Sequence, residues 1–430
     1  PLIYYGTPEQ KEKYLEKITS GEWCAAYCLT EPGSGSDALG AQATAVLSDD
    51  GKHYILNGTK QFITNGGFAE LFTVFAKIDK EHFTAFLVEK SFEGLVVGAE
   101  EKKLGIKGSS TTQIILDNCK VPVENLLGEK GKGHKIAFNV LNVGRFKLGA
   151  GVAGASKMAL VDGIKYANER KQFNTQISKF GAIKEKIADL TAAIYASESL
   201  VYRLAGHLDD KLDTIDKSID NYYEEYQKGI EEYAPECGIS KVFCSEVLAK
   251  TVDEVVQIHG GYGYVSEYPA ERYYRDERIN RIFEGTNEIS RLLIPGMILR
   301  KSMKGELPLQ AEAMKAFESL MTPSFEEIED KPFAAEKVLL KNMKTLFLIL
   351  AGAGVQKFMD KIANEQEILM AAADLAIQIY ALESAVLRAE KNYDAASDRK
   401  KELYLAAVKV FAFEAAEVGG TAARKGAFYV

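Results

Sequence analysis

The hydrophobic pattern of this chain changes from strand-like to helical near residue 120, which limits the folds open to it. Between Trp23 and about Leu116, turn-forming residues separate short runs rich in Val, Ile, Phe and Thr, at 54–57, 71–78, 83–88 and 111–117. Val121-Pro122 ends this region, and the pattern is helical from there to about residue 300. The sequence therefore predicts a compact β domain followed by helices, an α+β multidomain protein.

Helices are also expected at the two ends of the chain. Thr7-Pro8-Glu9-Gln10 has the form of a capping box with proline at the first helical position, so a helix should run to about Ile18. After residue 306 amphipathic helices return, for example at 334–350 and 366–391. We therefore divide the chain into a helical start, a β domain, a helical bundle and a C-terminal helical extension, at 1–22, 23–127, 128–305 and 306–430.

Composition excludes several classes of protein. The chain has 430 residues and a formal net charge of −8, which suits two or three domains but not a general nucleic-acid binder. Its five cysteines are odd in number and indicate reduced core thiols in a reducing compartment; none has the spacing of a zinc site, so we expect no metal. No uninterrupted apolar run approaches the length of a bilayer, and the extension has no basic cluster. Any membrane contact should therefore be peripheral.

The segment Arg281–Glu288 places one carboxylate, Glu284, between the aromatic Phe283 and Gly285. Glycine lets the backbone come close to a ligand, and a ring beside the carboxylate favours its desolvation. A desolvated carboxylate is a stronger base, as a general base that faces a C–H bond must be. From this segment alone, a surface glutamate that ends a helix before a glycine is an equal alternative.

Four further blocks precede this segment in a fixed order, and they are Glu31–Asp37 (EPGSGSD), Phe62–Gly66 (FITNG), Glu169–Phe173 (ERKQF) and Gln257–Gly261 (QIHGG). With Glu284 as the fifth block, the chain resembles the flavin-dependent acyl-CoA dehydrogenases from about its first residue to about residue 300. The resemblance implies a central antiparallel β domain and a C-terminal helical bundle. The extra C-terminal helical extension is similar to that of the very-long-chain branch. Residues 1–22 match the end of an N-terminal helical domain, most of which we expect to be missing from this chain.

The resemblance implies α,β-dehydrogenation of a fatty acyl-CoA to the trans-2-enoyl-CoA, as in fatty acid β-oxidation. Glu284 matches the base, FAD is the cofactor that accepts the hydride, and an electron-transfer flavoprotein takes the electrons. One relative carries its base at the position that corresponds to Gly144, where glycine cannot serve. The alternatives are an acyl-CoA oxidase of the same fold and a non-catalytic assembly or scaffold member of the family.

Further site residues follow from their match to the family. Those expected to bind FAD are Tyr27, Leu29, Thr30, Ser36, Phe62, Ile63, Thr64, Arg170, Gln172, Phe173, Gln257, Ile258, Gly260, Gly261, Thr286 and Glu288. Those expected to bind the substrate are Ser36, Asn142, Arg145, Phe283 and Gly285. Phe62 stands where many members carry tryptophan, and His259 is expected to be a turn residue rather than an acid or base.

The resemblance also implies an oligomer. Arg170 and Gln257–Gly261 match residues that reach the FAD of a neighbouring subunit, so we expect a homodimer or homotetramer. Gly144 and the small residues at 149–155 leave room for a long acyl chain, of about C14–C18. Tight packing between helices is the main interpretation of the glycines at 149–155. The acidic, tyrosine-rich segment 209–235 departs from the family and predicts a solvated insertion without a catalytic part. The compartment should be the cytoplasm of a bacterium or the mitochondrial matrix of a eukaryote.

Overall fold

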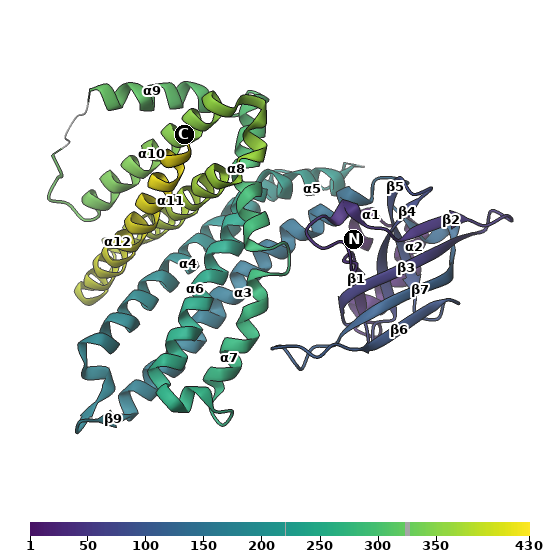
Figure 1. Cartoon of the computed structure of the whole chain (residues 1–430), viewed down its shortest axis with the longest axis horizontal. Helices are drawn as coiled ribbons and strands as arrows, with labels where there is room; N and C mark the ends of the chain where they lie inside the picture. The colour runs from purple at the N-terminus through teal and green to yellow at the C-terminus, as the bar shows by residue number, and fades with distance from the viewer. Residues whose placement is uncertain (220, 323–326) are drawn as a thin grey trace. The chain divides into compact units, whose positions relative to one another are not determined.

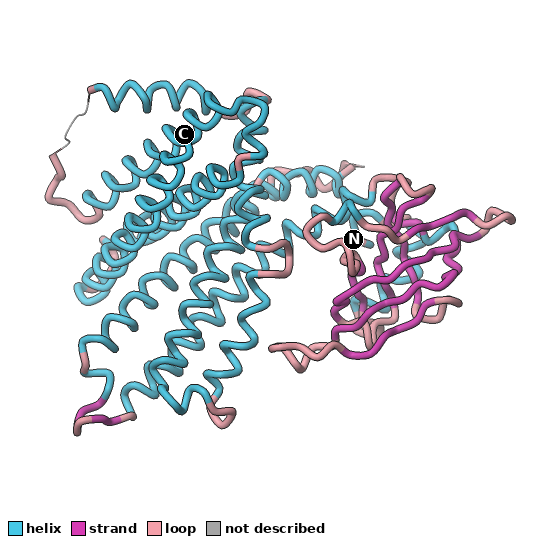
Figure 2. Tube along the Cα trace, in the orientation of Figure 1, coloured by secondary structure: helices cyan, strands magenta, loops and turns pink. Residues whose placement is uncertain are grey.

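The computed structural model describes residues 1–219, 221–322 and 327–430. By compactness the chain divides into two units (Figure 1), which we call the β unit and the helical unit. The β unit comprises Pro1–Leu141 with Lys217–Gln227, and the helical unit comprises Asn142–Asp216 with Lys228–Val430. Figure 2 shows that the described strands lie in the β unit, apart from a short ribbon of β9 (Lys171–Gln172) and β10 (Thr175–Gln176). The predicted β region followed by helices is thus confirmed.

The strands of the β unit form a mixed sheet. They are β1 (Ala25–Cys28), β2 (Thr44–Leu47), β3 (His53–Thr64), β4 (Leu71–Ile78), β5 (His82–Glu89), β6 (Leu95–Glu100), β7 (Thr111–Pro122) and β8 (Leu126–Leu127). Their order is β6-β7-β3-β2-β4-β5-β8, with β1 also paired to β4. All four runs predicted as strands lie within β3, β4, β5 and β7.

Two pairings differ from the antiparallel sheet that the resemblance implies. β1 runs parallel to Leu71–Val74 of β4, and β2 runs parallel to Lys77 and Ile78 of the same strand. The other pairs in this sheet are antiparallel. Hairpin turns indicate antiparallel neighbours locally, whereas β1 and β2 reach β4 through longer connections that no turn motif marks. Parallel pairing was therefore invisible in the sequence.

Strand β4 is buried on both faces, and its side chains alternate between two apolar clusters. Phe72 and Val74 belong to a cluster inside the sheet. Leu71 and Phe75 pack in a second cluster with Tyr14 of α2 (Pro8–Thr19). The predicted capping box begins α2, because Thr7 and Gln10 exchange both of its hydrogen bonds. Short helical segments complete the unit at α1 (Leu2–Tyr5), η1 (Ala38–Gly40) and η2 (Val123–Asn125).

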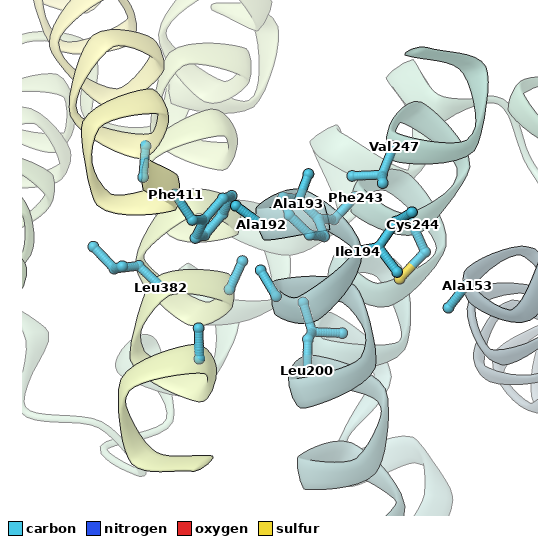
Figure 3. Close-up of a cluster of buried hydrophobic side chains, with 14 of the residues drawn as sticks. Ala153, Ala192, Ala193, Ile194, Leu200, Phe243, Cys244, Val247, Leu382 and Phe411 are labelled. Atoms are coloured by element: carbon cyan, nitrogen blue, oxygen red, sulfur yellow. The ribbon is translucent and has the colours of Figure 1, made fainter. Parts of the chain in front are cut away.

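Long helices build the helical unit, in which the bundle and the extension share one core. The described helices are α3 (Gly133–Glu169), which begins in the β unit, α4 (Gly181–Asp213), α5 (Tyr222–Glu232), α6 (Ala234–His259), α7 (Pro269–Glu277), α8 (Asn287–Met303), α9 (Leu309–Met321), α10 (Ala334–Phe358), α11 (Gln366–Tyr393) and α12 (Asp398–Tyr429). Figure 3 shows Ile194 of α4 and Phe243 of α6 in one apolar cluster with Leu382 and Phe411 of the extension. Phe411 packs edge-on against Phe243, with 5.6 Å between ring centroids. The apolar packing of α11 and α12 therefore attaches the extension to the bundle.

The glycine-rich run 149–155 lies inside α3, and its glycines have different surroundings. A Cβ atom added at Gly149 would lie 2.1 Å from Oγ of Ser240 on α6. Gly151 and Gly154 face open space within 4 Å. Close helix packing therefore explains Gly149 but not the other two.

The segment 209–235 is more ordered than a solvated insertion, apart from residue 220, which lies outside the described residues. Its first residues continue α4, and Tyr222–Glu232 forms α5. Tyr226 stacks on Tyr4 of α1 at 5.5 Å, and Tyr223 meets the same ring edge-on at 5.4 Å. These ring contacts could not be predicted, because Tyr4 lies far from Tyr223 and Tyr226 in the sequence.

One prediction from composition needs correction. Cys24, which directly precedes β1, is exposed, while the other four cysteines are buried and free.

Two helical segments, Ala334–Asn364 and Gln366–Tyr393, are long and apolar enough to span a membrane by length and composition. The apolar window of the second is 61% buried, as in a core helix, and that of the first is 22% buried. Scattered charges interrupt both windows, so neither appears in the sequence as an uninterrupted apolar run.

Candidate active site

The loop that carries Glu284 lies between two helical segments of the helical unit. It follows η5 (Arg278–Arg281) and ends at the cap of α8, where Thr286 Oγ1 accepts a hydrogen bond of 3.2 Å from the amide of Ile289. Glu284 and Gly285 have φ angles of +58° and +83°. The left-handed region favours glycine and is costly for glutamate, so the surrounding structure must hold Glu284 in place.

The carboxylate of Glu284 lies against Gly144 of α3. A Cβ atom added at Gly144 would be 2.6 Å from Oε2, so the glycine provides the space that the carboxylate fills. Oε2 is buried and accepts no hydrogen bond from any described residue. Burial raises the pKa of Glu284, and the nearby Arg145 and Lys241 oppose this effect. A desolvated carboxylate with an unpartnered oxygen is suited to take up a proton.

Arg145 and Asn142 hold the main chain of this loop. Arg145 Nε donates to the carbonyl oxygen of Glu284 at 3.1 Å, and its Nη1 donates to Asn142 Oδ1 at 3.1 Å. Both residues are buried, with 5% and 6% of their surface exposed. The guanidinium thus binds the backbone of Glu284 and leaves Oε2 without a hydrogen bond among the described residues. Phe283 is 39% exposed, so the burial of Glu284 depends on α3 more than on the neighbouring ring.

Lys241 of α6 is a residue of this site that the sequence analysis missed. Its side chain is fully buried, and Nζ donates to the carbonyl oxygen of Gly285 at 2.8 Å and to Asn287 Oδ1 at 2.6 Å. Burial, assisted by Arg145, lowers the pKa of Lys241 to about 8. The sequence contains one indication of this burial, which is that the lysine lies within the apolar run Gly238–Cys244. Helical periodicity places it on the buried face of the helix.

The residues expected to contact the FAD of a neighbouring subunit lie together at the end of α6. Gln257 and the buried Ile258 are in its last turn, and Gly260 ends the helix with a φ of +60°. Added Cβ atoms at Gly260 and Gly261 would meet nothing within 4 Å, so their backbone is open. The Arg170 guanidinium lies over the ring of Tyr262 in the segment that follows, 5.4 Å from its centroid.

The remaining predicted residues of the helical unit lie in two places. Gln172 and Phe173 are at the exposed tip of the β9–β10 ribbon, where Phe173 is 90% exposed. Thr286 and Glu288 lie at the start of α8, close in sequence to Glu284. His259 is buried and stacks on Tyr166 at 4.1 Å, and its Nδ1 is 2.7 Å from the carbonyl oxygen of Val255. These contacts agree with a structural histidine, although it ends a helix rather than lying in a turn.

In the β unit, the predicted flavin contacts come from two adjacent segments. Tyr27 lies on β1, with Leu29 and Thr30 directly after it, and Thr30 O accepts a hydrogen bond of 2.8 Å from the amide of Gln61. This bond joins the first segment to β3, which carries Phe62, Ile63 and Thr64. A shift of register between Lys60 and Ile63 accompanies a φ of +57° at Phe62, whose ring is 62% exposed. Ser36 is exposed in the loop after Thr30.

A buried ion pair holds these two segments together. Lys60 Nζ lies 2.6 Å from Glu31 Oε1, and the two side chains are 0% and 6% exposed. Lys60 also donates to the carbonyl oxygen of Leu29 at 3.3 Å, and Glu31 Oε2 accepts from the amide of Gln42 at 2.6 Å. Glu31 is the first residue of the motif Glu31–Asp37 and Lys60 precedes the motif Phe62–Gly66, but the sequence analysis did not predict that the two form a pair.

Comparison with known proteins decides the family. The middle-domain model of acyl-CoA dehydrogenases matches residues 26–119, and two of their C-terminal-domain models match 131–298 and 342–429. A probable acyl-CoA dehydrogenase of Bacillus subtilis is 51% identical over 96% of this chain and 70% of its own length. This chain belongs to the acyl-CoA dehydrogenase family.

A solved structure and a mitochondrial enzyme are also similar to this acyl-CoA dehydrogenase family member. The crystal structure of an acyl-CoA dehydrogenase complexed with FAD from Bacillus anthracis has a TM-score of 0.97 and 51% identity, covering 100% of this chain and 73% of that one. The very long-chain specific mitochondrial enzyme of Rattus norvegicus is 38% identical over 91% of this chain and 61% of its own length. The chain therefore spans less than two thirds of the rat enzyme. The predicted fold, a β domain with helical C-terminal domains, is confirmed.

The family is one of FAD-dependent oxidoreductases, and the residues of this member fit that cofactor. The β unit offers an exposed aromatic ring at Phe62, which can stack on a flat heterocycle. The helical unit offers the open backbone of Gly260 and Gly261 and the guanidinium of Arg170, groups that suit a pyrophosphate. No group of His, Cys, Asp or Glu in the described part of the chain could hold a metal ion.

Proposed function

We propose that this protein catalyses the FAD-dependent α,β-dehydrogenation of a long-chain fatty acyl-CoA, with Glu284 as the base. The observation that carries the proposal is the Glu284 carboxylate, which is buried against Gly144 with Oε2 unpartnered among the described residues. A structural carboxylate in such a setting would be paired or hydrogen-bonded. A general base instead needs a free oxygen and a raised pKa.

In this mechanism the side chains of the helical unit prepare one proton transfer. Glu284 takes the α-proton of the thioester, and the resemblance assigns its backbone N–H to the thioester carbonyl as a hydrogen-bond donor. FAD would supply the acceptor for the hydride that leaves the β-carbon. Arg145 and Lys241 bind the carbonyl oxygens of Glu284 and Gly285, so they fix the loop without occupying the carboxylate. Their positive charges also oppose the rise in the pKa of Glu284 that burial causes.

The cofactor contacts proposed for this chain are those that match the family. Tyr27, Leu29, Thr30, Ser36 and Phe62–Thr64 would hold the flavin part of FAD. Arg170, with Gln172 and Phe173, and Gln257–Gly261 would hold the FAD of a partner subunit in a homodimer or homotetramer. The exposure of Phe173 and the open glycine backbone support a contact outside the unit itself. Sedimentation of the FAD-loaded protein checks this, since a monomer that retains full FAD would contradict a shared site.

The preference for long chains rests on two observations. The extension is matched by a family model at 342–429, and a very long-chain specific relative is 38% identical. Each buried methylene contributes about 0.8 kcal/mol, so a deep site favours long chains until it is full. We also propose that an electron-transfer flavoprotein accepts the electrons, as part of fatty acid β-oxidation. The 51% identity to a Bacillus subtilis protein supports a bacterial cytoplasmic location.

Stopped-flow spectroscopy of the flavin absorbance tests the reaction and the chain length together. Under anaerobic conditions, palmitoyl-CoA should bleach the oxidised flavin, with kcat/KM more than about tenfold above that of butyryl-CoA. A maximum at four to six carbons would overturn the long-chain assignment and leave the reaction intact. No bleaching with any acyl-CoA would overturn the reaction itself. Adding an electron-transfer flavoprotein or oxygen after the bleach then identifies which acceptor reoxidises the flavin.

A further inference from the structure

A series of polar contacts runs from the C-terminal extension to the loop of Glu284. It begins at Asp374 of α11, whose Oδ1 accepts a hydrogen bond of 2.7 Å from Arg291 Nε on α8. The other two nitrogens of Arg291 bind both oxygens of Glu246 on α6, at 2.7 Å and 2.9 Å. This bidentate pair fixes the orientation of the guanidinium, so Arg291 connects three helices.

The series continues from Glu246 to the main chain beside the base. Asn287 Nδ2 donates to Glu246 Oε1 at 3.0 Å and to Ser245 Oγ at 3.1 Å. Its Oδ1 accepts from Lys241 Nζ at 2.6 Å, and the same ammonium donates to the carbonyl oxygen of Gly285 at 2.8 Å. Gly285 follows Glu284 directly, so the last contact bears on the strained part of the loop.

We propose that Asp374 is a positioning residue for the base, and that the extension thereby acts in the chemistry of the site. It acts through four side chains, which are Arg291, Glu246, Asn287 and Lys241. The inference rests on the proposed function, in which Glu284 takes the α-proton.

The loop needs such support because its conformation is unfavourable by itself. Glu284 has a φ of +58°, which a glutamate rarely adopts, and its Oε2 makes no hydrogen bond to a described residue that could hold the side chain. Its position therefore depends on the two carbonyl contacts, from Arg145 and from Lys241. A reacting group displaced by about 1 Å can lose about a hundredfold in rate.

Lys241 in turn depends on Asn287 for its position. The lysine is fully buried, so its ammonium has no access to water and needs acceptors at fixed distances. Asn287 is 2% exposed and offers one of them only while its amide nitrogen is held by Glu246 and Ser245. Arg291 holds Glu246, and Asp374 fixes the remaining Nε of Arg291. Loss of Asp374 should therefore loosen each contact a little rather than remove any.

The contribution of Asp374 to activity can be separated from its contribution to folding. The apolar cluster that contains Leu382 and Phe411 already attaches the extension to the bundle. The Asp374–Arg291 pair is partly solvated, with side chains 33% and 14% exposed. A pair of this kind contributes little to the free energy of unfolding.

Asp374→Asn is the test variant, and Glu383→Gln is its matched control. Glu383 lies on the same helix and pairs at 2.8 Å with Arg203 of α4, with similar exposures of 24% and 25%. It also binds Lys344, but none of its contacts among the described residues leads to the loop. Both variants should retain FAD and melt at the same temperature as each other. Asp374→Asn should slow flavin reduction at saturating palmitoyl-CoA by about three- to tenfold, and Glu383→Gln should leave it unchanged.

A double-mutant cycle with Lys241→Met shows whether the effect passes through the proposed residues. Lys241→Met should slow flavin reduction by about a hundredfold. It should also move the acid limb of the pH profile upward, because the lost charge of Lys241 no longer opposes the rise in the pKa of Glu284. In that background Asp374→Asn should have no further effect. If Lys241→Met does not fold, amide hydrogen exchange of residues 282–287 replaces the cycle, and it should be faster in Asp374→Asn than in Glu383→Gln.

The outcomes separate this inference from the proposed function. Flavin reduction by the unmodified protein tests the function alone. If the unmodified protein is reduced but Asp374→Asn and Glu383→Gln behave alike in rate and in exchange, the positioning role is wrong and the function stands. Additive effects of Asp374→Asn and Lys241→Met would also overturn it, because the two residues would then act independently.

Discussion

Each unit of this molecule buries a glutamate carboxyl group, and the two groups differ in what the nearby cations bind. In the β unit, Glu31 receives hydrogen bonds from Lys60 and from the amides of Gln42 and Ala43, so both of its oxygens are satisfied. In the helical unit, two cations also lie beside Glu284, but they donate to the main-chain carbonyls of Glu284 and Gly285. Oε2 of Glu284 accepts nothing from the described residues.

The difference shows how a fold distinguishes a structural charge from a reactive one. A fully paired carboxylate is stabilised in its ionised form and has no free oxygen for a substrate, as expected of a group that joins two strands. A carboxylate whose cations are turned to the backbone keeps their electrostatic effect and retains its reactivity. The number of nearby charges does not distinguish the two sites, whereas the atoms to which those charges donate do.

Glu284→Gln should produce the largest effect and separate chemistry from binding. The amide preserves the shape of the side chain but cannot take up a proton, so flavin reduction should slow by about a thousandfold or more, or ~4 kcal/mol. FAD and acyl-CoA should bind as before, which flavin absorbance and isothermal titration can measure. A rate within tenfold of the unmodified protein would show that another group is the base.

Lys60→Met should destabilise the β unit by about 3–5 kcal/mol, because it leaves the Glu31 carboxylate buried without its cation. Urea denaturation followed by fluorescence measures the change. The matched control is Lys120→Met, which breaks the exposed pair of Lys120 with Glu93 and should cost less than about 1 kcal/mol. Equal effects of the two substitutions would mean that the buried pair has no special structural role.

Gly144→Ala should misplace the base without unfolding the protein. The new methyl group would lie 2.6 Å from Oε2, and the carboxylate can move away because it is the end of a flexible side chain. We expect a fall in the rate of flavin reduction of about tenfold, or ~1.4 kcal/mol. Gly151→Ala on the same helix faces open space and should keep the full rate. An unchanged rate in Gly144→Ala would show that the site tolerates a shifted base.

The smallest expected effect is a change in the free energy of unfolding, which should have opposite signs for Glu284→Gln and Glu31→Gln. Burial raises the pKa of Glu284, so the folded state holds the proton of this group more tightly than the unfolded state does. The free energy of unfolding therefore falls as pH rises through that pKa and the proton is lost. Glu284→Gln should therefore raise the free energy of unfolding at pH 7 by about 1 kcal/mol, and this gain should vanish well below pH 4.5, where the glutamate is protonated in both states. Glu31→Gln should instead lower it. Thermal melts across pH provide the comparison.

The sequence by itself determined what depends on neighbouring residues along the chain. Strands such as Leu71–Ile78, the capping box at Thr7 and the glycine after Glu284 all follow from local spacing, and local spacing predicts secondary structure well. The ordered motifs also indicated the family, since each records a local backbone requirement. Glu284 could therefore be singled out as the candidate base before the fold was known.

Only the tertiary structure decided which charged side chains are buried and what they bind. Lys60 is 29 residues from Glu31, and Lys241 is 44 residues from Gly285, so no window of sequence contains either contact. The parallel pairing of β1 and β2 with β4 and the exposure of Cys24 depend on long-range packing in the same way. The sequence shows that a lysine lies in an apolar run, but it does not show what the lysine binds. Burial excludes water, so the ammonium can bind only the atoms of the elements that fold against it.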